Sequence, residues 1–141
     1  MLPRLSSVLA SRLPTTLSFA FFSSQTASSS TPSESQRLKM SVKQFVEDSI
    51  TSNKVVIFSK TWCPYCKKVK TLFAEKFPDV QPAIYELDER EEDGSAIQDY
   101  LYQKTGQRTV PSVFVGATHI GGNDDTQASF KQGELQKLIT A

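Results

Sequence analysis

Cysteine and histidine are scarce in this chain of 141 residues, which contains only Cys63, Cys66 and His119 of these two types. Because a zinc site as a rule takes four ligands, these three side chains are too few for an intramolecular zinc site. We therefore expect no metal, and we expect His119 to be a solvent-facing strand residue without a functional role. Any cysteine chemistry must take place at Cys63 and Cys66.

Long apolar runs and a strong excess of one charge are also missing. No apolar run approaches the roughly 20 residues that a membrane-spanning helix needs. Four of the 16 basic residues and one of the 15 acidic residues lie in residues 1–39, so residues 40–141 carry 12 basic and 14 acidic residues. A mildly acidic domain lacks the basic stripe that favours nucleic acid. We expect neither a membrane nor nucleic acid among the partners.

Acidic residues are absent from residues 1–33, which instead hold Arg4, Arg12 and many Ser and Thr residues. Apolar residues recur there near helical spacing, namely Leu2, Leu5, Val8, Leu9 and Leu13. A basic amphipathic helix that is poor in acids is typical of a mitochondrial transit peptide. We predict that residues 1–39 form a disordered or weakly helical leader, a transit peptide with a Ser/Thr-rich linker, which directs the protein to the mitochondrial matrix.

Two other interpretations of the leader stay open. A secretory signal would need one continuous apolar block, whereas the apolar block at residues 17–22 is short and interrupted by Ser18. An untargeted disordered tail agrees with the abundance of Ser, Thr and Pro over residues 28–35. Met40 follows this tract, and initiation there would give a product of 102 residues without the leader. Our hypothesis is that the chain yields both a mitochondrial form and a cytosolic form starting at Met40.

Residues 40–141 show the alternating helix and strand patterns of an α/β domain. Ser41 and Gln44 form a capping-box pattern, which predicts that a first helix begins at Ser41 and ends near residue 52. A β-branched and aromatic run at residues 55–58 predicts a strand that is buried on both faces. A helix from the cysteine pair to about Lys76 leads to a second strand at residues 83–87, and such a crossover predicts parallel strands.

The rest of the chain completes the predicted sheet. A third helix is expected between the acidic loop of residues 88–93 and Gly106, which supplies a stop. Residues 112–120 have the pattern of a β-hairpin. Asn123 is predicted to cap a fourth helix, and residues 133–140 form the last one. Together these elements predict a four-stranded mixed sheet flanked by helices.

The two cysteines lie where the first predicted strand leads into a helix. A cysteine at a helix N-terminus is stabilised as thiolate, the nucleophile of thiol exchange, by unpaired backbone N–H groups and the helix dipole. Pro64 suits the first helical position and leaves Cys63 at the cap with its sulfur outward, while Lys60 adds positive charge. Cys66 is expected to be less exposed and to act as the resolving thiol. A static disulfide across so short a loop would stabilise little, so redox chemistry is the better interpretation.

Three motifs extend this interpretation to the remainder of the domain. They are Cys63-Pro64-Tyr65-Cys66, Thr109-Val110-Pro111 and Gly121-Gly122-Asn123-Asp124-Asp125. In this order and spacing they resemble a dithiol glutaredoxin, and the resemblance covers about residue 41 to the C-terminus. The resemblance implies that residues 40–141 are a glutaredoxin domain with a thioredoxin fold and a cis peptide bond before Pro111. It also implies glutathione as co-substrate.

The same resemblance implies an enzyme that reduces glutathione mixed disulfides and protein disulfides, with Cys63 as nucleophile and Cys66 as resolving thiol. Its partners would be glutathione, glutathionylated or disulfide-containing proteins and, indirectly, glutathione reductase, and we expect a monomer. Glutathione would be held at its two carboxylates, its ammonium and its backbone. The implied contacts are Lys60 and Gln98 for the glycine carboxylate, Tyr65, Thr109, Val110, Pro111 and Gly122 along the groove, the N–H groups of Asn123 and Asp124 for the γ-glutamyl carboxylate, and Asp125 for the ammonium.

Three residues distinguish this chain within the resemblance. Trp62 before the cysteine pair is typical of thioredoxins, and Asn123 stands where many glutaredoxins have another cysteine. Pro64 goes, in the family, with redox activity rather than with a bridging iron–sulfur cluster. Two alternatives stay open: a thioredoxin-like reductase fed by a flavoprotein, and a non-enzymatic iron–sulfur carrier that dimerises around glutathione.

Overall fold

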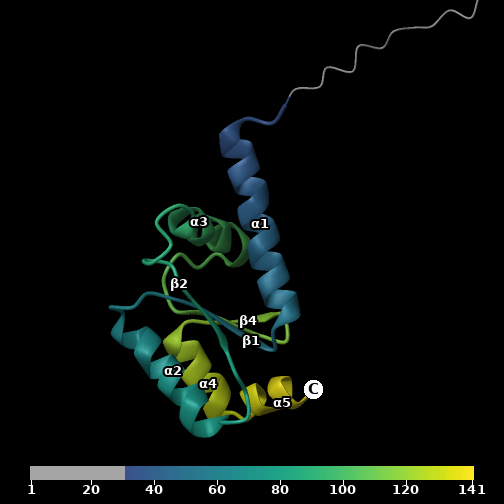
Figure 1. The fold of residues 1–141 in the computed structure, drawn as a ribbon. Helices are drawn as coiled ribbons and strands as arrows, with labels where there is room; N and C mark the ends of the chain where they lie inside the picture. The colour runs from purple at the N-terminus through teal and green to yellow at the C-terminus, as the bar shows by residue number, and fades with distance from the viewer. Residues whose placement is uncertain (1–30) are drawn as a thin grey trace, which may run out of the picture. The chain divides into compact units, whose positions relative to one another are not determined.

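The computed structural model describes residues 31–141, and the leader predicted at residues 1–39 therefore lies mostly outside the described residues. The helices and strands follow one another in the order shown in Figure 1: α1 (Glu34–Ser52), β1 (Val55–Ser59), α2 (Pro64–Lys76), β2 (Ala83–Glu86), α3 (Gly94–Thr105), β3 (Ser112–Val115), β4 (Thr118–Gly121), α4 (Asn123–Lys131) and α5 (Glu134–Thr140).

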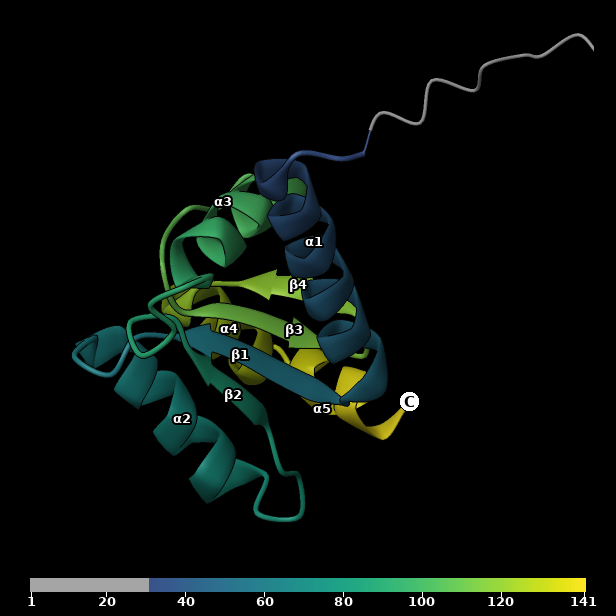
Figure 2. The ribbon, with the colours of Figure 1, turned by 45° about the horizontal axis from the view of Figure 1, so that its top comes forward.

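The four strands form one mixed sheet in the order β2-β1-β3-β4. Strand β1 pairs with β2 in parallel and with β3 antiparallel, and β3 pairs antiparallel with β4. Figure 2 shows β1 and β3 in the middle of the sheet. Because β1 has a neighbour on each side and helices on both faces, all five of its residues are buried. The predicted mixed sheet, parallel crossover and buried strand are confirmed.

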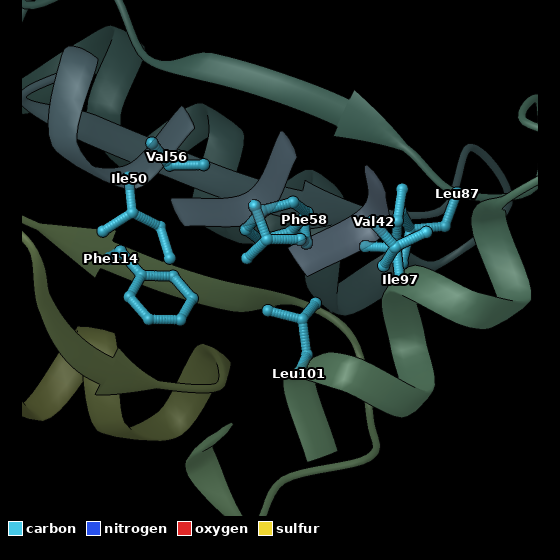
Figure 3. Packing of buried hydrophobic residues seen from close by; sticks show 9 residues of the cluster. Val42, Ile50, Val56, Phe58, Leu87, Ile97, Leu101 and Phe114 are labelled. Carbon is cyan, nitrogen blue, oxygen red and sulfur yellow. The ribbon is translucent and has the colours of Figure 1, made fainter. Parts of the chain in front are cut away.

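Helices cover both faces of the sheet, with α1 and α3 on one face and α2, α4 and α5 on the other (Figure 1). The first face holds a core that contains Phe58 and Phe114 (Figure 3). The centre of the Phe58 ring lies 6.0 Å from that of Phe114 and 5.6 Å from that of Tyr85. Burying a phenylalanine of this kind contributes about 1.5–3 kcal/mol. The opposite core is built from β1, β3, α2 and α5, and its buried members are Val55, Ile57, Val69, Leu72, Phe73, Val113, Val115 and Leu135.

The start of α1 differs from the prediction. The helix begins at Glu34, because Ser33 is its N-cap and forms a capping box with Gln36, in which the Ser33 hydroxyl accepts from the Gln36 N–H at 3.3 Å. The predicted start at Ser41 is therefore wrong; its hydroxyl donates to the Leu38 carbonyl at 2.9 Å within the helix. Residues 34–39 are mostly good helix formers and are all exposed, so this turn and a half is helical without burying a side chain. The domain boundary at residue 40 stays a prediction.

The other helix ends agree with the sequence to within one residue. Gly106 ends α3 in the left-handed conformation at φ 77°, as predicted. Helix α4 begins one residue away from its prediction, because its N-cap is Gly122 and Asn123 is the first helical residue. Within residues 31–141, no helix is both long and apolar enough to cross a membrane.

Candidate active site

Cys63 lies at the N-cap of α2, immediately after the turn that follows β1. Its N–H donates to the Lys60 carbonyl at 3.1 Å, and its own carbonyl accepts from the Lys67 N–H at 3.2 Å, so the backbone on both sides is fixed. Its Sγ lies 3.8 Å from the Val110 carbonyl oxygen. The sulfur was predicted to point outward. Cys63 is less exposed than this prediction implies, because only 5 % of the residue is accessible to solvent.

Cys66 lies one helical turn further along α2 and is completely buried. Burial raises the pKa of the Cys66 thiol, and the neighbouring Cys63 raises it further. A raised pKa keeps Cys66 protonated at neutral pH, and a protonated thiol is a poor attacking group. The predicted difference in exposure is confirmed, and both cysteines are free thiols.

The loop opposite Cys63 contains the predicted cis peptide bond between Val110 and Pro111. The side chain of Gln107 stabilises the conformation of this loop. Its Nε2 donates to the Thr109 carbonyl at 3.0 Å and to the Pro111 carbonyl at 2.9 Å. Gln107 was not among the residues predicted from the sequence. Only its position, just before the Thr-Val-Pro motif, could have indicated this role in the sequence. A long amide side chain at that position can donate to loop carbonyls that are not paired with a strand.

A groove of about 480 Å³ runs along this loop. Eight of the ten residues predicted to bind glutathione line it, and Gln107 lines it as well; the eight are Tyr65, Thr109, Val110, Pro111, Gly122, Asn123, Asp124 and Asp125. These residues come from α2, from the loop before β3 and from the start of α4. The fold therefore gathers the three sequence motifs into one site.

The start of α4 closes one end of the groove. Gly121 has φ 125°, and a Cβ there would lie 2.3 Å from an Asp125 carboxylate oxygen, so only glycine fits. The Gly122 N–H donates to Asp125 Oδ2 at 3.3 Å. Asn123 Nδ2 donates to Asp124 Oδ1 at 2.9 Å, while Asn123 Oδ1 is buried with no partner among the described residues. A helix N-terminus of this kind is suited to an anionic group.

Lys60 and Gln98 lie apart from this groove. They line a separate hollow of about 330 Å³ together with Trp62. Gln98 Nε2, the predicted donor, is already engaged at 2.6 Å with the Arg108 carbonyl. Asp88 also lines the hollow, and hydrogen bonds from Thr61 lower the pKa of its carboxyl. The roles predicted for Lys60 and Gln98 stay predictions.

His119 is not a solvent-facing residue, and that prediction is wrong. It is half-buried on β4, where its Nε2 lies 3.3 Å from the Ser112 hydroxyl and its ring centroid lies 4.9 Å from that of Phe114. The two rings meet because Phe114 and His119 are cross-strand partners and share a face of the sheet. Burial lowers the pKa of His119. Among residues 31–141 there is no cluster of three or more His, Cys, Asp or Glu side chains arranged to hold a metal ion.

Comparisons with known proteins agree with the geometry. The glutaredoxin family model matches residues 55–120. Over 95 residues the chain is 53 % identical to Glutaredoxin-C4 of Arabidopsis thaliana, covering 67 % of this chain and 68 % of that protein. Over 100 residues it is 50 % identical to Glutaredoxin-1 of Rhizophagus irregularis, covering 71 % of this chain and 96 % of the relative.

Solved structures give the same result. The crystal structure of a buckwheat glutaredoxin–glutathione complex is similar with a TM-score of 0.68 and 45 % identity, covering 77 % of this chain and 94 % of that chain. The relatives also include one named Monothiol glutaredoxin-S12, chloroplastic, of Arabidopsis thaliana, at 43 % identity over 98 residues, which are 70 % of this chain and 54 % of that protein. The chain belongs to the glutaredoxin family, a family of glutathione-dependent thiol oxidoreductases.

Proposed function

We propose that this protein reduces glutathione mixed disulfides and protein disulfides, with Cys63 as the nucleophile and glutathione as the reductant. One observation carries the proposal: the Cys63 sulfur lies at the N-cap of α2, 3.8 Å from the Val110 carbonyl, beside the groove of eight predicted glutathione contacts. The glutathione complex of the similar buckwheat protein supports glutathione as the molecule that occupies the groove.

The first step is a thiol–disulfide exchange. The Cys63 thiolate attacks the glutathione sulfur of a glutathionylated protein, the disulfide breaks, and the protein thiolate leaves and takes up a proton. Cys63 is then joined to glutathione. A second glutathione, as thiolate, attacks the glutathione sulfur of this mixed disulfide, which releases oxidised glutathione and restores the Cys63 thiolate. The net reaction uses one free glutathione to convert one glutathione mixed disulfide into the protein thiol and oxidised glutathione.

The groove supplies groups that match the chemistry of glutathione. Val110 precedes the cis bond and would offer its backbone N–H and carbonyl to the tripeptide as an added strand. The N–H groups of Asn123 and Asp124 at the start of α4 would receive the γ-glutamyl carboxylate. Asp125 is exposed beside them and would meet the ammonium group.

Lys60 and Gln98 are the proposed partners of the glycine carboxylate of glutathione, and they differ in how available their side chains are to bind it. Lys60 is a cation that makes no ion pair among the described residues. Gln98 would first have to give up its hydrogen bond to the Arg108 carbonyl. We therefore assign the larger share of this contact to Lys60.

Cys66 is proposed to act only on protein disulfides, where it resolves the mixed disulfide between Cys63 and the substrate. Its complete burial and raised pKa support this role, because a protonated thiol does not compete for the first attack. A relative named as a monothiol glutaredoxin is also similar to this chain, so family membership alone does not decide whether Cys66 is used.

A coupled assay with glutathione, glutathione reductase and a small glutathione mixed disulfide tests the proposal. We expect turnover in this assay and none when thioredoxin reductase replaces the glutathione system. Turnover with thioredoxin reductase alone would favour a thioredoxin-like reductase. A brown, iron-containing protein after anaerobic purification, with no turnover, would favour an iron–sulfur carrier.

Targeting is a separate part of the proposal. We propose that residues 1–39 direct the protein to the mitochondrial matrix and that initiation at Met40 gives a cytosolic form. Residues 34–39 are all exposed, and the buried positions of α1 begin at Val42, so a product starting at Met40 would keep every buried contact of this helix. A fluorescent protein fused to residues 1–39 should enter mitochondria; import into chloroplasts, for which the relative named chloroplastic is a precedent, would contradict the assignment.

A further inference from the structure

Helix α2 carries an uneven charge beyond the cysteine pair. Its sequence holds four lysines against the single acid Glu75. Lys70 pairs with Glu86 on β2. The other three, Lys67, Lys68 and Lys76, make no ion pair with any described residue. This side of α2 therefore has positive charge that the rest of the described domain does not neutralise.

The uncompensated lysines surround a hollow between α2 and α4, which lie side by side (Figure 1). The hollow has a volume of about 460 Å³, and Lys131 of α4 adds a fourth cation to its rim. Leu72 and the half-buried Phe130 give it an apolar surface, and Glu75 is the one acidic residue that lines it. We call this site the lysine hollow. Its chemistry fits a partly apolar, acidic stretch of polypeptide.

The lysine hollow adjoins the reactive end of the glutathione groove. Tyr65 lines that groove, and Lys68 Nζ lies 5.3 Å from the centre of the Tyr65 ring. Lys67 and Lys68 follow Cys66 directly in the sequence. A protein that is joined by a disulfide to glutathione in the groove would therefore lie next to the hollow, at Tyr65 and Lys68.

We propose that the lysine hollow receives an acidic segment of the protein substrate, next to the glutathionylated cysteine. This inference rests on the proposed function, because it assumes that Cys63 attacks the glutathione sulfur and that the protein thiol leaves from that sulfur. Attraction between opposite charges would speed encounter and orient the substrate before the exchange step. The hollow would thus select among glutathionylated proteins, while the groove recognises the glutathione that all of them share.

Helix geometry sets where the acidic residues must lie. Helix α2 has 13 residues, so its last residue, Lys76, lies about 20 Å along the axis from the cap at Cys63. An extended peptide advances about 3.3 Å per residue and covers this distance in about six residues. Lys67 and Lys68 are reached after about two residues on the same scale. The acids should therefore lie about two to six residues from the modified cysteine.

An extended polyanion fits the surface less well than an acidic peptide. Asp124 and Asp125 are exposed at the start of α4, the helix that also carries Lys131 of the hollow, and they line the groove together with Tyr65. A nucleic acid strand or an anionic membrane that covered the lysines would also bring its charges near these carboxylates. A short peptide segment can occupy the lysine hollow alone.

Peptides with one glutathionylated cysteine provide the test. The first carries four acids at two to six residues from the cysteine, and the second has Asn and Gln in place of these acids. The third has the acids at nine to thirteen residues from the cysteine. Each peptide is made in two versions, with the segment on the N-terminal or on the C-terminal side of the cysteine. We expect the wild-type kcat/KM for the first peptide to exceed that for the second about tenfold on one flank at low salt. The third peptide should behave as the second, and 0.5 M salt should remove the difference.

Charge reversal locates the effect. The double variant Lys76→Glu/Lys131→Glu should lose the preference, whereas Lys76→Arg/Lys131→Arg should keep it. Lys39→Glu/Lys43→Glu on α1 has the same change in net charge outside the hollow and should also keep it. All variants should turn over a small glutathione mixed disulfide at a rate within about twofold of wild type, since these lysines lie outside the groove. If the wild type itself did not turn over this small substrate, the proposed function would be overturned instead.

Three outcomes would overturn the inference. The wild type could show equal kcat/KM for the acidic and the Asn/Gln peptides, or the α1 variant could lose the preference as fully as the variant in the hollow. The third is stronger inhibition of peptide turnover by an oligonucleotide or by phosphatidylserine vesicles than by an unmodified acidic peptide, with loss of that inhibition in Lys76→Glu/Lys131→Glu. That result would assign the hollow to a nucleic acid or a membrane instead.

Discussion

Cys63 and Cys66 lie three positions apart in the sequence and about one turn apart at the start of α2, yet their surroundings differ. Cys63 lies at the cap of α2, where it is 5 % exposed and its Sγ is 3.8 Å from the carbonyl oxygen of Val110, a residue that lines the groove. Cys66 lies inside the first turn, is completely buried, and has a raised thiol pKa. One turn of helix therefore gives the two thiols different surroundings, which supports the proposed division into a nucleophile and a resolving thiol.

Removing each sulfur in turn is the strongest way to break this comparison. Cys63→Ser should lower turnover of a glutathione mixed disulfide by about a thousandfold or more, because it removes the nucleophile. Cys66→Ser should keep this activity within a few fold and lose the reduction of protein disulfides. Initial rates on a small mixed disulfide and on a disulfide-bonded protein measure both effects, and an active Cys63→Ser enzyme would contradict the assignment.

A substitution that disturbs the backbone at the start of α4 tests the proposal that Cys63 works beside a glutathione groove. In Gly121→Ala the new Cβ would meet the Asp125 carboxylate, so the proposed glutathione anchor should shift and the KM for glutathione should rise about tenfold, or 1.4 kcal/mol. Gly106→Ala is the matched control, because Gly106 also has a positive φ but a Cβ there would meet no atom within 4 Å. The control should cost about 1–2 kcal/mol in stability and leave the KM unchanged. An equal rise in both variants would place the effect in general destabilisation.

Gln107 tests whether the loop opposite Cys63 must be fastened. Gln107→Ala removes two hydrogen bonds to loop carbonyls, which should cost about 1–2 kcal/mol of unfolding free energy and raise the KM for glutathione a few fold. Urea denaturation and steady-state kinetics measure the two effects. Gln103→Ala, on the exposed surface of α3, is a control that should change neither quantity. A normal KM in a destabilised Gln107→Ala protein would show that the loop holds its place without this side chain.

The raised pKa of the Cys66 thiol allows a test of the Cys66 half of the comparison by varying the pH. In Cys63→Ser, Cys66 is the only thiol, and its alkylation by iodoacetamide needs the thiolate. Because burial favours the neutral thiol, the midpoint of the rate against pH should lie above the ordinary value of 9.0. A midpoint at or below that of free cysteine would contradict the protonated, reserve state.

His119 gives the smallest expected effect. Burial lowers its pKa, so the unfolded chain binds a proton near pH 6.5 while the folded protein does not. Stability should therefore fall as the pH drops below about 6.5 through the lower folded pKa. Urea midpoints at pH 7.5 and pH 5.5 should differ more for wild type than for His119→Gln. An equal difference would assign the acid sensitivity to other groups.

The sequence was sufficient for the sheet and for most of the site, since these depend on local signals. The run at residues 55–58 predicts a doubly buried strand, and Pro64 after Cys63 predicts a helix N-terminus. Gly106 predicts the end of α3. Three motifs far apart in the chain then meet because the start of α2, the loop before β3 and the start of α4 line one groove.

The errors come from competition between equivalent signals and from tertiary contacts. Ser33 and Ser41 both begin a capping-box pattern, and the helix extends to the first because the residues between them favour helix. His119 is buried by the pairing of its strand with Phe114, which the alternation within β4 alone does not reveal. The contacts of Lys60 and Gln98 with glutathione stay predictions, and the hydrogen bond from the Gln98 amide to the Arg108 carbonyl could not be read from the sequence either.

Mass spectrometry of the Cys66→Ser protein tests the central claim most directly. After incubation with a glutathionylated protein and quenching in acid, Cys63 should carry one glutathione as a disulfide, and the target protein should have lost its own. Added glutathione should then remove the group and produce oxidised glutathione. The absence of any glutathione on Cys63, with the target still modified, would contradict the account.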